Sequence, residues 1–152
     1  MGRHVVLSLF LVVSTTGCAA FSGAPPLAVK TSCSPEQAWE AALAGVSSLK
    51  IDDKDKEKGT ITTQWAVMES GQLAGVFQRN ANRERARFFL ALDRHSDDVT
   101  ISVRQTREYF SPMGVQSQST RWRRMSPLAE EEHRVMQRIS ARLKEDGCAI
   151  LP

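Results

Sequence analysis

The sequence predicts an α+β fold in which a single antiparallel sheet of about five or six strands carries two helices on one face. Three observations lead to this expectation. Two segments repeat their apolar residues at helical spacing, and each follows a serine–proline pair. Between them, apolar and polar residues alternate with the period of two that is typical of half-buried strands. The two amphipathic helices are then available to cover the apolar face of the sheet.

The first elements are a strand over 27–30 and a helix. Ser34 is placed to cap that helix, with Pro35 at the first helical position and Gln37 completing a capping box. Trp39 opens the apolar stripe of the helix, and we expect it to be a core residue. The resulting order of elements is strand, helix, four strands and helix.

The middle of the chain predicts the sheet. A short strand around Ile51 leads through a solvated turn at 52–59 into an alternating segment at 61–67. In that segment one face is expected to hold Ile61, Thr63, Trp65 and Val67. Two longer strands, over 85–92 and 99–104, are joined by a tight turn at 95–98.

The last elements are a strand around Trp122 and a second helix. Ser126 and Pro127 repeat the signal for a helix start, so the helix is expected to begin there. Its apolar stripe is followed by Gly147, which predicts the helix end. This glycine stands directly before Cys148.

The N-terminus has a basic start, a nine-residue apolar run at 5–13 and the pair Gly17–Cys18. The run is an h-region, because a helix that spans a bilayer needs roughly 20 residues. This start resembles a bacterial lipoprotein signal. The resemblance implies removal of residues 1–17 and acylation of Cys18. Residues 18–26 would then be a short tether before a single α+β domain at 27–152.

The same resemblance implies a location in the cell. Lipoproteins of diderm bacteria that stay at the inner membrane carry Asp after the cysteine, whereas this chain has Ala19. We therefore expect the protein at the cell outer membrane, anchored through its N-terminal lipid and facing the periplasm. The alternative is an ordinary secretory signal cut after Ala20 or Ala24, which would give a soluble periplasmic or secreted protein.

Under either reading two cysteines remain in the domain, Cys33 and Cys148. In an exported chain an even pair is expected to form a disulfide. Cys33 stands at the start of one predicted helix and Cys148 at the end of the other, so antiparallel helices would bring them together. The alternative is two unpaired buried thiols.

Composition excludes some classes of function. Removal of residues 1–17 would take away Arg3 and no acid, lowering the formal charge from +3 to +2. Such a balance does not favour nucleic acid as a partner. His95 and His133 have no close ligand spacing for a metal, and no nucleophile elbow or phosphate-binding glycine loop is present. We therefore predict no enzyme activity, no cofactor and no metal site.

One further resemblance concerns the run at 34–39, the helix it starts, and the segments at 50–53 and 59–65. These segments are similar to the helix-grip repeat of the BamC family, the lipoprotein accessories of the outer-membrane β-barrel assembly machinery. The resemblance implies a helix-grip-like topology over about 27–145. It also implies a non-enzymatic, lipid-anchored scaffold or assembly factor that has an envelope protein as partner.

Two surfaces are candidates for binding. The first is a rim formed by two long loops. One loop, at 69–84, connects the 61–67 segment to the 85–92 strand, and the other follows the 99–104 strand. Both loops should leave the same end of the sheet and bind a protein or an envelope lipid. Its apolar residues are Leu73, Val76, Phe77, Phe110, Met113 and Val115, and its arginines are Arg79, Arg83, Arg121 and Arg123. Alternatively, these loops fold over the sheet edge and complete the core.

The second candidate is the sheet face away from the helices, which is expected to carry Arg85, Arg87, Phe89 and Arg104. Three cations beside an aromatic ring are suited to an anionic polymer or to the acidic segment of a partner. The alternative is a solvated face without a ligand. The predicted function is thus an interaction or scaffold module, and the alternative is a carrier that holds a lipid or small amphiphile between helices and sheet.

Overall fold

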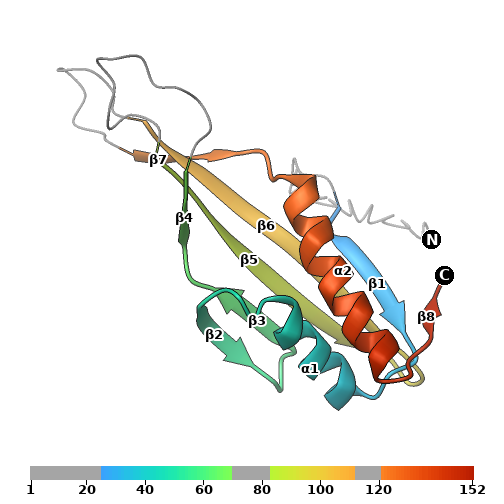
Figure 1. The fold of residues 1–152 in the computed structure, drawn as a ribbon. Coiled ribbons are helices and arrows are strands. Elements are labelled where there is room, and N and C mark those ends of the chain that lie inside the picture. The colour runs from blue at the N-terminus through green and yellow to red at the C-terminus, as the bar shows by residue number, and fades with distance from the viewer. Residues whose placement is uncertain (1–24, 70–82, 112–120) are drawn as a thin grey trace, which may run out of the picture.

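The structure is a computed structural model, and it describes residues 25–69, 83–111 and 121–152 (Figure 1). In these segments the chain forms one antiparallel sheet with two helices on one face, which confirms the predicted α+β class. The expected strand number was wrong, because the sheet has eight strands. The additional strands arise where the 61–67 segment divides into two and where the C-terminus adds a short strand.

The elements are bounded as follows: β1 (Leu27–Thr31), α1 (Pro35–Gly45), β2 (Ile51–Asp55), β3 (Thr60–Thr63), β4 (Ala66–Glu69), β5 (Arg83–Arg94), β6 (Val99–Ser111), β7 (Arg121–Met125), α2 (Ala129–Glu145) and β8 (Ile150–Leu151). The sheet order is β2-β3-β5-β6-β1-β8, with β4 added to β5 and β7 added to β6. The long hairpin of β5 and β6 is therefore the centre of the sheet.

This hairpin has two parts with different neighbours. Near its turn, where the His95 N–H donates to the Asp98 carbonyl, β3 and β1 flank it. Toward its open end the flanking strands are β4 and β7. Figure 1 shows this open end extending past the two helices. The strand ends that bracket both long loops lie here, at one end of the sheet, as the alternation predicted.

Helix α1 begins as predicted. The Ser34 Oγ accepts from the Gln37 N–H at 3.3 Å, and the Gln37 Oε1 accepts from the Ser34 N–H at 3.1 Å. These two bonds satisfy donors that a helix start leaves free. Trp39 is buried, with 5% of its surface exposed, so its predicted role in the core is confirmed.

The predicted start of α2 was wrong. The helix begins at Ala129 rather than at Ser126 and Pro127, and no side chain of its own caps it. The reason is a tertiary contact, because the buried Gln105 of β6 accepts the Leu128 N–H on its Oε1 at 2.8 Å. The Gln105 N–H in turn donates to Glu132 at 2.7 Å. A strand residue therefore performs the capping that the local sequence signal assigned to a serine.

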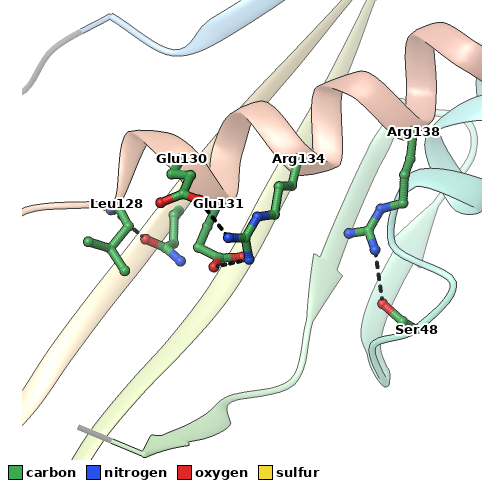
Figure 2. A network of polar contacts seen from close by, with 7 residues as sticks. Ser48, Leu128, Glu130, Glu131, Arg134 and Arg138 are labelled. Carbon is green, nitrogen blue, oxygen red and sulfur yellow. Dashed lines mark hydrogen bonds and ion pairs between the residues drawn. The ribbon is translucent and has the colours of Figure 1, made fainter. Parts of the chain in front are cut away.

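The outer side of α2 carries ion pairs that Figure 2 shows. Arg134 contacts Glu130 at 2.6 Å and Glu131 at 2.9 Å. One turn further along, the Arg138 Nη1 donates to the Ser48 Oγ at 3.4 Å, which joins α2 to the segment after α1 (Figure 2). These exposed contacts contribute little each. The opposite, apolar side of α2 packs into the core.

The core fills the space between helices and sheet. From the sheet it receives Ile61, Phe88, Leu90, Ile101 and Val103, and from α2 it receives Val135, Met136, Ile139 and Leu143. Helix α1 contributes mostly small residues, and a Cβ added at Gly45 would lie 2.4 Å from the Ile139 Cγ1. The two helices are therefore in direct van der Waals contact at this crossing.

The disulfide between Cys33 and Cys148 is present, with Cα atoms 5.2 Å apart, which confirms the predicted pairing. Gly147, at φ +77°, ends α2 and directs the chain toward it. The Gly147 N–H bonds the Lys144 carbonyl and the Cys148 N–H bonds the Leu143 carbonyl, the two bonds of a Schellman motif. The bridge thus ties the C-terminal end of α2 to the start of α1.

A β-bulge separates β3 from β4. Thr62 pairs with Phe89 and Ala66 pairs with Ala86, so the three residues at 63–65 face only the two at 87–88. One extra residue turns every later side chain to the opposite face. The expectation that Ile61 and Val67 share a face was therefore wrong. Ile61 is in the core, whereas Val67 is 74% exposed.

Thr63 stabilises this bulge. Its buried Oγ1 accepts the Phe88 N–H at 2.9 Å, a bond that the disrupted ladder does not supply. Thr63→Val should therefore lower the free energy of unfolding by about 1–3 kcal/mol, because a buried donor loses its acceptor. Urea unfolding measures this change. The matched control is Thr62→Val, on the opposite and partly exposed face, which should change the free energy by less than about 0.5 kcal/mol. Equal losses in both variants would contradict the capping role.

Candidate functional site

The sheet face opposite the helices, called the open face below, carries the most distinctive side-chain arrangement of the described residues. In β5 the buried residues Ala86, Phe88, Leu90 and Leu92 point toward the helices. The odd-numbered residues between them lie on the open face, and Arg85 pairs there with Glu108 of β6. The predicted face residues Arg85, Arg87, Phe89 and Arg104 all lie on it.

Arg85 is at the centre of this arrangement. Its guanidinium carbon lies 4.3 Å from the ring centroid of Trp65 and 4.1 Å from that of Trp122. Its Nε and Nη2 both donate to one carboxylate oxygen of Glu108, at 2.9 and 2.7 Å. A planar cation over two indole rings is a favourable cation–π geometry, and the carboxylate fixes its orientation.

Two more residues extend the arrangement. The Arg87 guanidinium lies 4.7 Å from the Trp65 centroid. On the other side, Phe110 packs edge-on against Trp122, with centroids 5.4 Å apart and rings inclined by 64°. We call this set the arginine–tryptophan cluster, and its members are Trp65, Arg85, Arg87, Glu108, Phe110 and Trp122.

The backbone explains how these residues meet. The bulge at 63–65 turns the chain so that Trp65 meets the open-face arginines of β5. On the other side, β7 pairs with β6 so that Trp122 stands opposite Phe110. The cluster therefore spans the open end of the β5–β6 hairpin from one flank to the other.

Sequence reasoning missed both tryptophans as site residues. Trp65 had been placed on the core face with Ile61, because the alternation runs through the bulge without a visible break. Trp122 was predicted to lie in a strand, but its face was not determined. The position of Glu108 could have been predicted from the sequence. The tight turn at 95–98 fixes the register of the hairpin, and this register places Glu108 opposite Arg85.

At the open end of the hairpin, positive charge on this face exceeds negative charge. Arg85 is paired with Glu108, but no ion pair joins Arg87, Arg104 or Arg124 to a carboxylate of the described segments. Arg104 and Arg124 are exposed, and Arg87 is half-buried. These three guanidinium groups are therefore available to an anionic ligand.

Apolar side chains flank the cations. Phe89 is 43% exposed and pairs with Arg104 across the hairpin, while Val67 lies beside Arg85 on β4. Arginine, tryptophan and phenylalanine are the residue types that contribute most at binding surfaces. This open-face chemistry is suited to binding an anion together with an apolar contact.

The predicted rim is only partly described. Leu73, Val76, Phe77, Arg79, Met113 and Val115 lie outside the described residues. Of the others, Phe110 belongs to the cluster on the open face, and Arg83 is exposed at the start of β5. Arg123 pairs with Tyr109 on the helix side of the sheet, and Arg121 is the first residue of β7. Phe110 and Arg123 therefore lie on opposite faces.

Other candidate chemistry is sparse in the described segments. His95 and His133 are both exposed, and the His133 Nδ1 lies 2.7 Å from the Ala129 carbonyl oxygen of its own helix. No group of three potential metal ligands is found among residues 25–69, 83–111 and 121–152. Neither of the two described helices is long and apolar enough to cross a bilayer. Cys18 and the predicted signal lie outside these segments.

The predicted solvated turn at 52–59 was partly wrong, because residues 52–55 belong to β2. The remaining turn at 56–59 is exposed at 56–58. The Asp55 carboxylate accepts the backbone N–H groups of Glu57 and Lys58, both at 3.0 Å. The hydrogen bonds from the Lys58 backbone and side chain lower the pKa of Asp55 below its usual value. These local hydrogen bonds explain the conformation of the turn.

Comparison with known proteins leaves the family of the chain open. No protein-family model matches the sequence. The search of curated proteins also returns no match. The resemblance to the BamC family therefore stays a prediction.

Proposed function

We propose that this chain is an exported envelope protein, anchored at the outer membrane through an acylated Cys18, that acts as a non-catalytic interaction module. The observation that carries the proposal is the arginine–tryptophan cluster, a set of aromatic and cationic groups on a sheet face that no described helix covers. The disulfide supports the exported location, because such bonds form and persist in oxidising compartments.

The interior supports a module rather than a carrier. The core residues that face one another across the helix–sheet interface, including Ile101, Val103, Ile139 and Leu143, are fully buried. Helix α1 contacts α2 so closely at Gly45 that an added Cβ would collide with Ile139. A carrier would need a cavity of ligand size between these layers. The described core instead has the tight packing of a structural interior.

Lipidation tests the location. The full chain should be produced in a diderm bacterium with an alkyne-labelled fatty acid, and its mature N-terminus should be examined by mass spectrometry. We expect a mature protein that begins at acylated Cys18 and fractionates with the outer membrane. Cys18→Ala should lose the label and leave the membrane fraction. An unlabelled wild-type chain cut after Ala20 or Ala24 would contradict the anchor.

Site-specific crosslinking tests the module. A photoreactive amino acid at Phe89, in the centre of the open face, should give crosslinked products in intact cells. The matched control places the same group at Arg138, which is exposed on the outer side of α2. Products at Phe89 and none at Arg138 would support binding through the open face. A Phe89 variant that crosslinks to nothing would contradict the interaction role.

A further inference from the structure

The two helices and the open end of the hairpin carry net charges of opposite sign. The two helices carry six acidic and four basic residues. On the other side, the open end of the hairpin presents Arg85, Arg87, Arg104 and Arg124 with Glu108 as their described counter-charge. Arg83 stands opposite Glu69 in the register, so their formal charges offset each other. The open end of the hairpin therefore carries a net positive charge on the open face, whereas the residues of the two helices sum to a net negative charge.

The attachment point of the tether lies in this same region. The first strand begins at Leu27, which pairs with Val103, the neighbour of Arg104. The cluster at Glu108 is five residues further along β6, about 17 Å away. The tether at 18–26 has nine residues, which can extend to about 30 Å at most. A lipid on Cys18 would therefore keep the open-face arginines within reach of the membrane surface.

We propose that the open face docks on the anionic phospholipid headgroups of the membrane that holds the anchor. Arg87, Arg104 and Arg124 contact headgroup phosphates, while Phe89 and Val67 lie at the boundary of headgroups and acyl chains. The inference rests on the proposed function, since the anchor supplies the proximity. The acidic helix layer then faces the periplasm.

The expected energies of binding favour anionic phospholipid headgroups as the ligand of the open face. A basic residue near an anionic membrane contributes about 1 kcal/mol, so three arginines give an attraction that is weak for a free protein. The anchor makes it effective, because a link of nine residues holds the face at a local concentration in the millimolar range. Tryptophan is enriched at membrane–water interfaces for its apolar ring and polar N–H. The cationic and aromatic face matches such a surface.

The two cluster tryptophans provide the readout. The acylated full-length mature protein should be reconstituted in phosphatidylcholine vesicles with or without phosphatidylglycerol, each containing a lipid with a nitroxide on its headgroup. Trp65 and Trp122 are half-buried on the open face, whereas Trp39 is in the core and supplies a constant background. We expect fluorescence quenching to be at least about twofold stronger with phosphatidylglycerol, and to fall toward the phosphatidylcholine value in high salt.

Charge reversal on the two sides separates docking from a general charge effect. The open-face variant is Arg87→Glu/Arg104→Glu/Arg124→Glu, and it should lose the quenching that depends on phosphatidylglycerol. The control reverses three exposed arginines of α2, Arg134, Arg138 and Arg142, and should keep it. Circular dichroism checks folding of both. If a variant is unfolded, the lipid and salt dependence of the wild-type protein decides the question alone.

Each outcome has a separate meaning. Acylated protein whose quenching is equal in both vesicles would overturn docking and leave the proposed function intact. Equal loss in both charge-reversal variants would also overturn it. Crosslinking of Phe89 to a protein rather than to phospholipid would assign the face to an acidic protein partner instead. Absence of the acyl chain would overturn the proposed function and docking together.

Discussion

Reduction of the Cys33–Cys148 disulfide is expected to lower the free energy of unfolding by about 5 kcal/mol. The bridge closes a loop with a sequence separation of 115 residues, and such a loop strongly restricts the unfolded chain. Native domains are stable by only about 5–15 kcal/mol, so the reduced protein should be marginal or unfolded at growth temperature. Urea unfolding with and without a thiol reductant measures the loss.

The lower free energy of unfolding should arise mainly because the unfolded chain is less restricted without the bridge. In the native state the same chain ends are also held by hydrogen bonds, because the Thr31 Oγ1 and the Ser32 N–H both donate to the Ala149 carbonyl, at 3.0 and 3.1 Å. Cys33→Ser/Cys148→Ser should therefore match the reduced wild-type protein in stability while keeping its native fold under stabilising conditions. A loss below about 1 kcal/mol would show that the unfolded chain is compact even without the bridge.

This result also bears on location. A domain that needs its disulfide folds poorly where thiols are kept reduced. The full chain produced without export should then accumulate in an unstable, reduced form. An oxidising compartment, as proposed for this chain, is thus an expected condition for its folding.

Local signals predicted the elements whose interactions are local. The capping box at Ser34 and the hairpin turn at 95–98 depend on residues within a few positions of each other, and both were found where expected. The disulfide was predictable because only two of the three cysteines lie outside the predicted signal and lipidation site. Its position at the ends of antiparallel helices agreed with the predicted topology.

Elements set by distant contacts were not predictable. The serine–proline signal at 126–127 is a reasonable helix start, but Gln105 satisfies the Leu128 N–H and moves the start. The bulge before Trp65 contains no glycine and does not interrupt the alternation, so its reversal of faces is invisible in the sequence. Trp122 follows a long connection that leaves its register undetermined. The candidate site depends on the bulge at 63–65 and on the register of β7, which explains why its arginines were predicted and its tryptophans were not.

The second large effect is expected at the centre of the cluster. Arg85→Met should lower the free energy of unfolding by about 3 kcal/mol, because it removes two cation–π contacts and a two-donor hydrogen bond to Glu108. Urea unfolding measures the loss, and near-ultraviolet circular dichroism should show that Trp65 and Trp122 lose their fixed environment. Arg104→Met is the matched control on the same face, and should change stability by less than about 0.5 kcal/mol.

Two further variants separate the contributions within the cluster. Arg85→Lys keeps the charge but loses the planar group that stacks on both rings, so a loss close to that of Arg85→Met would assign the effect to stacking. Arg85→Met/Glu108→Met removes the carboxylate that the single variant leaves unpaired, and it should recover part of the stability. A double variant no more stable than Arg85→Met would show that the indole contacts alone hold the cluster. The same rings and cations form the proposed docking face, so Arg85 also positions the groups that this face presents.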